Sequence, residues 1–218
     1  MNIQKVPNID IADLNDDEQY TLLDTLQHGN IKEFVVRELE PHALWARIAN
    51  MYQIGGLLAF MLAGFRAFMP FFAQKESSAL LYFMFGTAFS FTVLVVLHEL
   101  IHALAYKAIG AHNISYGIQL RKFLFYVQAN NQVLNYDNMK VVALAPAVVV
   151  AAVCVVGMIV FYQHSLFYSF AAVFGLHSLF CAGDMGMLSY FENRKDKCIL
   201  TYDDKAKGCS YFFEKNLA

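Results

Sequence analysis

The sequence VLVVLHELIHALAYK, residues 93–107, contains the motif HELIH inside an otherwise apolar run. A charged residue at the centre of a membrane helix costs about 2.5–3.5 kcal/mol on insertion scales, so polar residues at that depth usually have a function. His98 and His102 are four residues apart and share one helical face, with Cβ atoms about 5–6 Å apart. Two imidazoles at that spacing can bind one tetrahedral zinc ion at about 2.0–2.1 Å.

Glu99 follows His98 directly and is the candidate general base. In an H-E-x-x-H helix the carboxylate can take a proton from the attacking water and later give it to the leaving amine. We therefore predict that Glu99 is catalytic and that His98 and His102 are metal ligands. The alternative is a structural cluster of hydrogen-bonded side chains, and the motif also arises by chance.

The composition predicts an all-α polytopic membrane protein. Apolar residues make up 58% and charged residues 16% of the 218 residues, whereas soluble domains are about 45–50% apolar and about 25% charged. No basic stripe with interleaved aromatic residues occurs, which argues against nucleic acid as a partner. The four cysteines form no CxxC pair and are expected to be reduced thiols, and the N-terminus has no apolar stretch typical of a cleavable signal peptide.

Four apolar stretches approach the length of about 20 residues that a spanning helix needs. They predict transmembrane helices at residues 51–73, 79–106, 141–162 and 166–191, within a membrane domain at 49–191. Residues 1–48 are expected to be a cytoplasmic segment with two short amphipathic helices. Their apolar stripes are Leu22, Leu23 and Leu26, and then Phe34, Val35 and Leu39. Residues 192–218 are charged and are expected to be a cytoplasmic tail.

The segment between the second and third spans, residues 110–139, contains strand signals. The stretch ISYGIQL, residues 114–120, alternates apolar with polar or small residues, and residues 123–127 and 132–136 are rich in β-formers. We expect a hairpin or small sheet near the metal site, with a plain cytosolic loop as the alternative. The strand at 114–120 is a candidate for binding an extended substrate by strand addition.

The distribution of Lys and Arg predicts the orientation in the membrane. These residues gather in the N-terminal segment, in the segment after the second span and in the C-terminal tail, and only Arg66 and Lys75 fall on the other side. By the positive-inside rule both termini are cytoplasmic, and the chain is a multi-pass protein of the cell membrane.

Asp184 is the candidate third metal ligand, because a catalytic zinc usually has three protein ligands and one water. It is the one carboxylate besides Glu99 inside the predicted spans. HELIH and Asp184 each lie about seven residues before the cytoplasmic end of their span, which at about 1.5 Å per residue places both roughly 10 Å from that edge. Gly183 and Gly186 flank Asp184 and would permit close helix approach.

Other polar residues receive lesser roles. His177 lies two turns deeper than Asp184 and is a candidate for a supporting position behind a ligand. Cys181 is expected to pack in the core, and Glu192 is a weaker rival for the third ligand. The remaining histidines are expected to have no role in the site, namely His28, His42, His112 and His164.

With HELIH in one span, an aspartate in a later span and a strand-like segment between them, the chain resembles the putative zincin peptidases, a bacterial membrane family similar to the site-2 proteases. The resemblance covers about residues 80–191. It implies that His98, His102 and Asp184 bind zinc, that Glu99 is the base, and that the membrane is a bacterial plasma membrane. Ala145-Pro146 is similar to the small-Pro segment of site-2 proteases, but the Asn that often follows there is absent, and Asp184 lacks their LDG-like setting.

The sequence thus predicts a membrane-embedded metalloprotease with one Zn²⁺ per chain. Its substrate would be a peptide bond in or near a transmembrane segment of another protein, and its other partner the lipid bilayer. A metal-binding sensor or scaffold without proteolysis is the first alternative, and it would not require Glu99. A small transporter is the second, although the chain shows no internal repeat.

Overall fold

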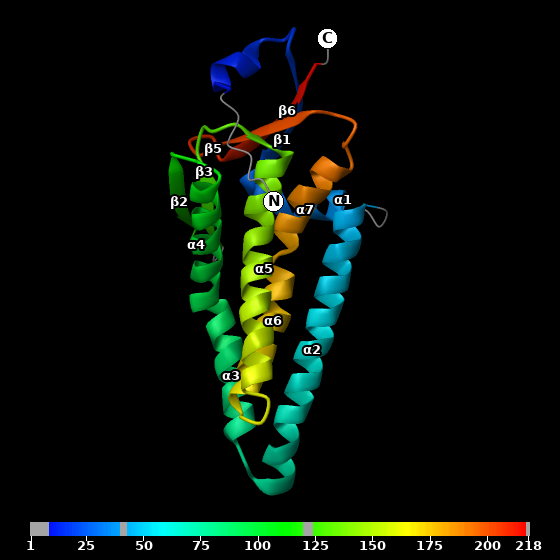
Figure 1. Ribbon diagram of the computed structural model, residues 1–218, viewed down its shortest axis with the longest axis vertical. Coiled ribbons are helices and arrows are strands. Elements are labelled where there is room, and N and C mark those ends of the chain that lie inside the picture. Colours follow the sequence, from blue (N-terminus) through cyan, green and yellow to red (C-terminus); the bar gives the residue numbers. More distant parts are fainter. Residues whose placement is uncertain (1–8, 40–42, 120–123, 217–218) are drawn as a thin grey trace. The chain divides into compact units, whose positions relative to one another are not determined.

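A computed structural model describes residues 9–39, 43–119 and 124–216 of the chain (Figure 1). The chain divides into two compact units. The first comprises Met1–Arg47, Glu99–Ala145 and Gly183–Ala218, and the second comprises Ile48–His98 and Pro146–Ala182. Four helices contribute residues to both units, because the chain passes from one unit to the other within them: α2 (Leu44–Gln74), α4 (Val93–Ala108), α5 (Tyr136–Val160) and, by its first residue alone, α7 (Ala182–Glu192).

The first unit is built on a four-stranded antiparallel sheet with the order β1-β6-β5-β4. Its strands are β1 (Tyr20–Gln27), β6 (Cys209–Lys215), β5 (Ile199–Asp204) and β4 (Leu134–Asn135). The 3₁₀ helix η1 (Ile11–Asn15) precedes β1, and a second short one, η2 (His28–Asn30), follows it. One apolar cluster on this sheet joins residues from distant parts of the sequence: Leu14, Tyr20, Val133, Leu200 and Phe213.

The sheet corrects three predictions. The protein is mostly helical but not all-α, because it also contains two β-sheets. The stripe of Leu22, Leu23 and Leu26 is strand β1 and not an amphipathic helix, since residues 20–27 pair with β6. The C-terminal residues are not a plain tail, because they supply β5 and β6. The second predicted amphipathic helix is confirmed as α1 (Ile31–Glu38).

The strand signals between the second and third predicted spans are confirmed as an antiparallel hairpin. It consists of β2 (Ile114–Gln119) and β3 (Leu124–Ala129), in a register that places Tyr116 opposite Val127. Residues 120–123, where the second predicted strand begins, lie outside the described residues. The third strand signal becomes β4, which pairs with β5 and so belongs to the larger sheet.

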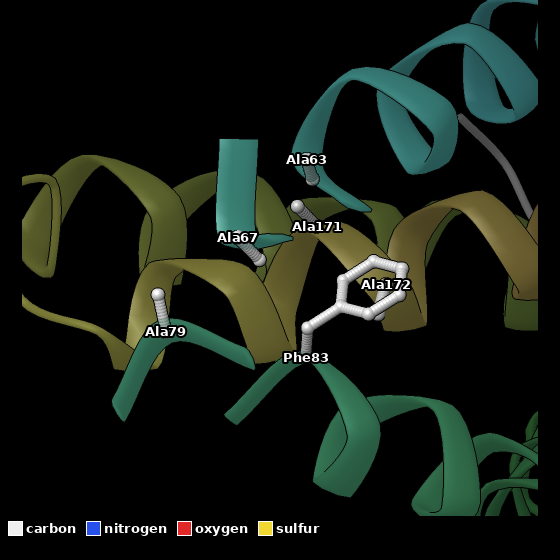
Figure 2. Close-up of a cluster of buried hydrophobic side chains, with 6 residues drawn as sticks. All are labelled: Ala63, Ala67, Ala79, Phe83, Ala171 and Ala172. Carbon is white, nitrogen blue, oxygen red and sulfur yellow. The ribbon is translucent and has the colours of Figure 1, made fainter. Parts of the chain in front are cut away.

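The core of the second unit is made by small residues where α2, α3 (Ser78–Phe91) and α6 (Leu166–Phe180) meet (Figure 2). Phe83 shares this buried cluster with five alanines, which are labelled in Figure 2: Ala63, Ala67, Ala79, Ala171 and Ala172. Gly86 brings α3 against α6, because a Cβ at this position would lie 2.5 Å from the carbonyl oxygen of Ser169. Small side chains allow such close packing of apolar helices.

Two helices, α2 and α5, are each long and apolar enough to cross a membrane. The other two predicted spans are each a pair of helices. The first pair, α3 and α4, bends by 48°, and the second pair, α6 and α7 (Ala182–Glu192), bends by 41°. Among the described residues there are therefore two such helices, or up to four spans if each bent pair counts as one.

The two bends lie next to the candidate site residues. Thr92 ends α3 with φ −118° and ψ −84°, outside the helical region, and its hydroxyl donates to the carbonyl oxygen of Ala88 at 2.9 Å. Cys181 ends α6 with ψ 2°. As a result the HELIH motif lies entirely within α4, and Asp184 lies in the first turn of α7.

Candidate metal centre

His102 connects three segments of the first unit. Its Nδ1 lies 3.1 Å from the carbonyl oxygen of Val142 on α5, and its Nε2 lies 3.2 Å from Oδ1 of Asp184 on α7. The His102 residue is 7% exposed. Both ring nitrogens of one buried histidine therefore face oxygen atoms from other helices.

The sequence explains why the Val142 carbonyl is available to His102. In an α-helix a carbonyl accepts from the amide four residues later, and the residue four positions after Val142 is Pro146. Proline has no N–H, so this intrahelical bond cannot form. The imidazole of His102 can donate in its place.

These contacts define the protonation of His102. A backbone carbonyl only accepts hydrogen bonds, so Nδ1 of His102 carries a proton, and whenever the ring is neutral its Nε2 has the lone pair. That lone pair faces the carboxylate of Asp184, which when ionised also only accepts. A proton or a metal cation between these two atoms makes the arrangement favourable.

The spacing and the donor types fit a zinc ion. Two ligands of a tetrahedral zinc, each about 2.0–2.1 Å from the metal, are about 3.3–3.4 Å apart, and Nε2 of His102 and Oδ1 of Asp184 are 3.2 Å apart. Imidazole nitrogen and carboxylate oxygen are both common zinc ligands. His98 precedes His102 by one turn of the same helix, so the two imidazoles share one helical face.

Asp184 lies in the first turn of α7, where the helix dipole stabilises a negative charge. Gly186 packs against α1, because a Cβ there would lie 3.0 Å from Cγ2 and 3.2 Å from Cα of Val35. A Cβ on Gly183 would meet no described atom within 4 Å. Of the two glycines, Gly186 is therefore the one at a close helix contact, and its neighbour there is the amphipathic helix α1.

Glu99 is held by the hairpin. Its Oε2 accepts the backbone N–H of Val127 at 2.8 Å, from strand β3. In the hairpin register Val127 lies opposite Tyr116, whose carbonyl oxygen accepts from Nζ of Lys205 at 2.9 Å. Both backbone groups are thus directed to the outer edges of the two-stranded sheet, and the edge of β3 lies beside Glu99.

In the second unit, His98 contacts His177 on α6. Nδ1 of His98 lies 3.1 Å from Nε2 of His177, which is fully buried. Nδ1 of His177 lies 3.5 Å from the hydroxyl of Tyr52 and 3.6 Å from Sγ of Cys181, also fully buried. The donor atoms of His98, His177 and Cys181 all lie within 4.8 Å of one another.

The predicted site residues therefore fall into two contacts joined by one turn of α4. His102 lies against Asp184, and His98 lies against His177. Glu192 is the last residue of α7, at the opposite end from Asp184. Of the histidines expected to have no role, His42 lies outside the described residues, whereas Nδ1 of His164 accepts the backbone N–H of Leu166.

Three contacts at the site were not predicted, and two of them had a signal in the sequence. Pro146 lies four residues after Val142, which indicates a carbonyl that can accept from another group. Cys181 lies four residues after His177 and hence on the same face of a helix. The amide of Val127 had no such signal, because only the folded hairpin brings it to Glu99.

A family model described as putative zincin peptidase matches residues 91–199, half of the 218-residue chain. The match includes the HELIH motif, the β2–β3 hairpin, Pro146, His177 and Asp184. The description indicates a metallopeptidase and implies zinc. No curated protein and no solved structure matches the chain.

Proposed function

We propose, since this chain belongs to the putative zincin peptidase family, that it is a membrane-embedded zinc metalloprotease. The proposed ligands are His98, His102 and Asp184. The observation that carries the proposal is the 3.2 Å contact between Nε2 of His102 and Oδ1 of Asp184. Because Nδ1 of His102 already faces the Val142 carbonyl, a cation is the natural occupant between these two acceptors.

Zinc, when bound, would polarise the scissile carbonyl and acidify the attacking water. Glu99 would take the proton from that water at its carboxylate and pass it to the leaving amine. The N–H of Val127 would orient the carboxylate, because it holds Oε2 at 2.8 Å. The helix dipole at the start of α7 would keep Asp184 ionised as a ligand.

The proposed substrate is a peptide bond in or near a transmembrane segment of another protein. The motif lies in helix α4, which is apolar over most of its length. Several apolar side chains of this helix are exposed: Val93, Val96, Leu97, Leu100 and Leu104. An extended substrate can add to an open strand edge through backbone hydrogen bonds. We assign this role to β3 rather than to residues 114–120, because β3 is the strand whose edge contacts Glu99.

We further propose that the chain is a multi-pass protein of a bacterial plasma membrane with both termini in the cytoplasm. The support is the distribution of Lys and Arg, together with two to four helices of spanning length and composition. The proposed relationship to the site-2 proteases depends on the arrangement of HELIH, a following hairpin and a later aspartate, as the sequence indicates.

The test compares wild type with Glu99→Gln in host cells, using mass spectrometry of protein N-termini from membrane fractions. We expect new N-termini within or beside apolar segments in the wild-type cells alone. The Glu99→Gln protein should retain zinc, because its carboxylate is not a proposed ligand. Identical sets of N-termini would refute proteolysis and favour a metal-binding sensor or scaffold.

A further inference from the structure

The strongest unexplained cluster lies behind His98 and comprises His177, Cys181 and Tyr52. His177 and Cys181 are fully buried and His98 is 7% exposed. The side chains come from three helices. His98 belongs to α4, His177 to α6 and Tyr52 to α2, and Cys181 is the residue at which α6 ends. Burying polar groups here is costly unless they are hydrogen-bonded to one another.

When both rings are neutral, the hydrogen bond between His98 and His177 can run in either direction, which gives two solutions for the protons of this pair. In the first, Nδ1–H of His98 donates to Nε2 of His177 at 3.1 Å, and Nδ1–H of His177 faces Cys181 and Tyr52. In the second, Nε2–H of His177 donates to Nδ1 of His98, and Nε2 of His98 then carries the other proton. Only the first solution leaves Nε2 of His98 with the lone pair that a metal requires.

We infer that His177 is a positioning residue that fixes the tautomer and ring orientation of His98. It would accept the Nδ1 proton of His98 and donate its own Nδ1 proton toward Cys181 and Tyr52. This inference rests on the proposed zinc site. It gives His177 the same role toward His98 that the Val142 carbonyl has toward His102, namely to accept the Nδ1 proton. The two histidines of the motif are then oriented through Nδ1 by different devices, a backbone carbonyl and a second imidazole.

The position of Cys181, and not the length of the His98–His177 contact, favours this role over direct binding of a second metal. The 3.1 Å contact between the two imidazoles has the length of a hydrogen bond, but it is as near to a ligand spacing as the 3.2 Å contact of His102 with Asp184. Sγ of Cys181 lies 3.6 Å from Nδ1 and 3.8 Å from Nε2 of His177, so it does not single out the Nε2 that a shared metal with His98 would need. The test must therefore distinguish the positioning role of His177 from a metal held by His98, His177 and Cys181.

The first measurement is the zinc affinity of the full-length protein, by competition with a chromophoric chelator. Partners that orient a metal-ligating histidine are worth about 10- to 100-fold in affinity. We expect a loss of this size in His177→Asn, whose side chain is too short to replace Nε2. We expect near-wild-type affinity in His177→Gln, whose carbonyl oxygen can occupy the Nε2 position and accept from His98. His164→Gln, at a remote histidine, is the control.

The second measurement is the ¹⁵N spectrum of the imidazoles in the zinc-free protein, which reports tautomers and does not depend on any activity. His98 should be the Nδ1–H tautomer in wild type and in His177→Gln, and a mixture of tautomers in His177→Asn. Equal affinities in the two variants, or an unchanged tautomer in His177→Asn, would overturn the inference. If Asp184→Ala retains zinc, the proposed zinc site itself fails, whereas the tautomer result would still stand.

The third measurement uses cobalt(II) in place of zinc. A thiolate ligand gives cobalt an intense charge-transfer band in the near ultraviolet, whereas a ligand set of histidine and carboxylate gives none. We expect no such band in the wild-type protein. A band that disappears in Cys181→Ser and persists in Cys154→Ser would contradict the positioning role and identify Cys181 as a metal ligand.

Discussion

The Nδ1 atom of His102 lies 3.1 Å from the carbonyl oxygen of Val142, the residue four positions before Pro146. The proline thus acts on the site through this carbonyl, because it lacks the N–H that would otherwise compete for it. The family resemblance pointed to the small-Pro segment at residues 145–146, and the structure supplies a physical reason for the proline in this chain.

Pro146→Ala should restore an amide that competes with His102 for the Val142 carbonyl. We expect zinc affinity to fall by about 10-fold, the lower end of the usual effect of such partners. The stability of the protein should be unchanged or higher, since proline inside a helix costs about 3 kcal/mol. Chelator competition measures the expected fall in zinc affinity, and thermal unfolding measures the unchanged or higher stability.

Pro70→Ala is the matched control, because Pro70 is also inside a helix, α2, which carries none of the candidate ligands. It should change stability in the same direction and leave zinc affinity unaltered. Equal zinc affinity in Pro146→Ala and wild type would show that the proline does not act through His102.

Val127→Pro should reduce cleavage and leave zinc bound. The substitution removes the N–H that Glu99 accepts at 2.8 Å, and misplacement of a catalytic group by about 1 Å can cost on the order of 100-fold in rate. The hairpin should survive, because this N–H is not used for pairing with β2 and proline is tolerated at strand edges. Val127→Ala keeps the amide and should keep the rate, so equal losses in both variants would point to the side chain instead.

Gly186→Ala should disturb the site through α1. The added Cβ would lie 3.0 Å from Cγ2 of Val35 and 3.2 Å from its Cα, and overpacking of this kind costs about 1–3 kcal/mol. Asp184 is two residues away on the same helix, so zinc affinity should fall as well. Gly183→Ala meets no described atom within 4 Å and should be neutral, or more stable by up to about 1 kcal/mol. A neutral Gly186→Ala would mean that α1 and α7 can separate at no cost.

Glu38→Gln should weaken the first unit without changing the chemistry. The Glu38 carboxylate is 3% exposed and accepts from Nη1 of Arg194 and Nε of Arg37, both at 2.8 Å. Only the carboxylate of the pair is buried, since the side chains of Arg37 and Arg194 are 55% and 30% exposed, so the loss of its charge should cost about 1–3 kcal/mol. Denaturant unfolding should show a loss of this order, and zinc per folded chain should stay constant. The control is Glu33→Gln, at an exposed glutamate of the same helix. A Glu38→Gln protein as stable as wild type would show that the Glu38 carboxylate does not stabilise the first unit.

The parts of this fold that the sequence predicts are those fixed by local pattern. The spacing of His98 and His102 in an apolar run gives α4, and the alternation at 114–120 gives β2. The prediction of a helix at strand β1 was wrong. Over so short a stretch, the positions of Leu22, Leu23 and Leu26 do not distinguish the helical period of about 3.6 residues from the strand period of 2. Its strand character depends on pairing with β6, nearly 190 residues later, which no local signal reports.

The bends at Thr92 and Cys181 could not be read from the sequence either. Thr92 has apolar residues on both sides and no proline or glycine beside it, and the glycine near the second break, Gly183, lies two residues after Cys181 and inside α7. At the site, the depth argument placed Asp184 level with the motif, and the structure brings it against His102. The contact of His98 with His177 was underestimated, since it depends on how α6 packs on α4 and not on distance along one helix.

The most direct test of the zinc site is the metal content of the purified full-length protein, by inductively coupled plasma mass spectrometry. Wild type, Glu99→Gln and Glu192→Ala should each hold about one zinc ion per chain, as a site with three protein ligands predicts. Asp184→Ala should hold almost none, because the oxygen that lies 3.2 Å from His102 is then removed. A full complement of zinc in Asp184→Ala would contradict the account.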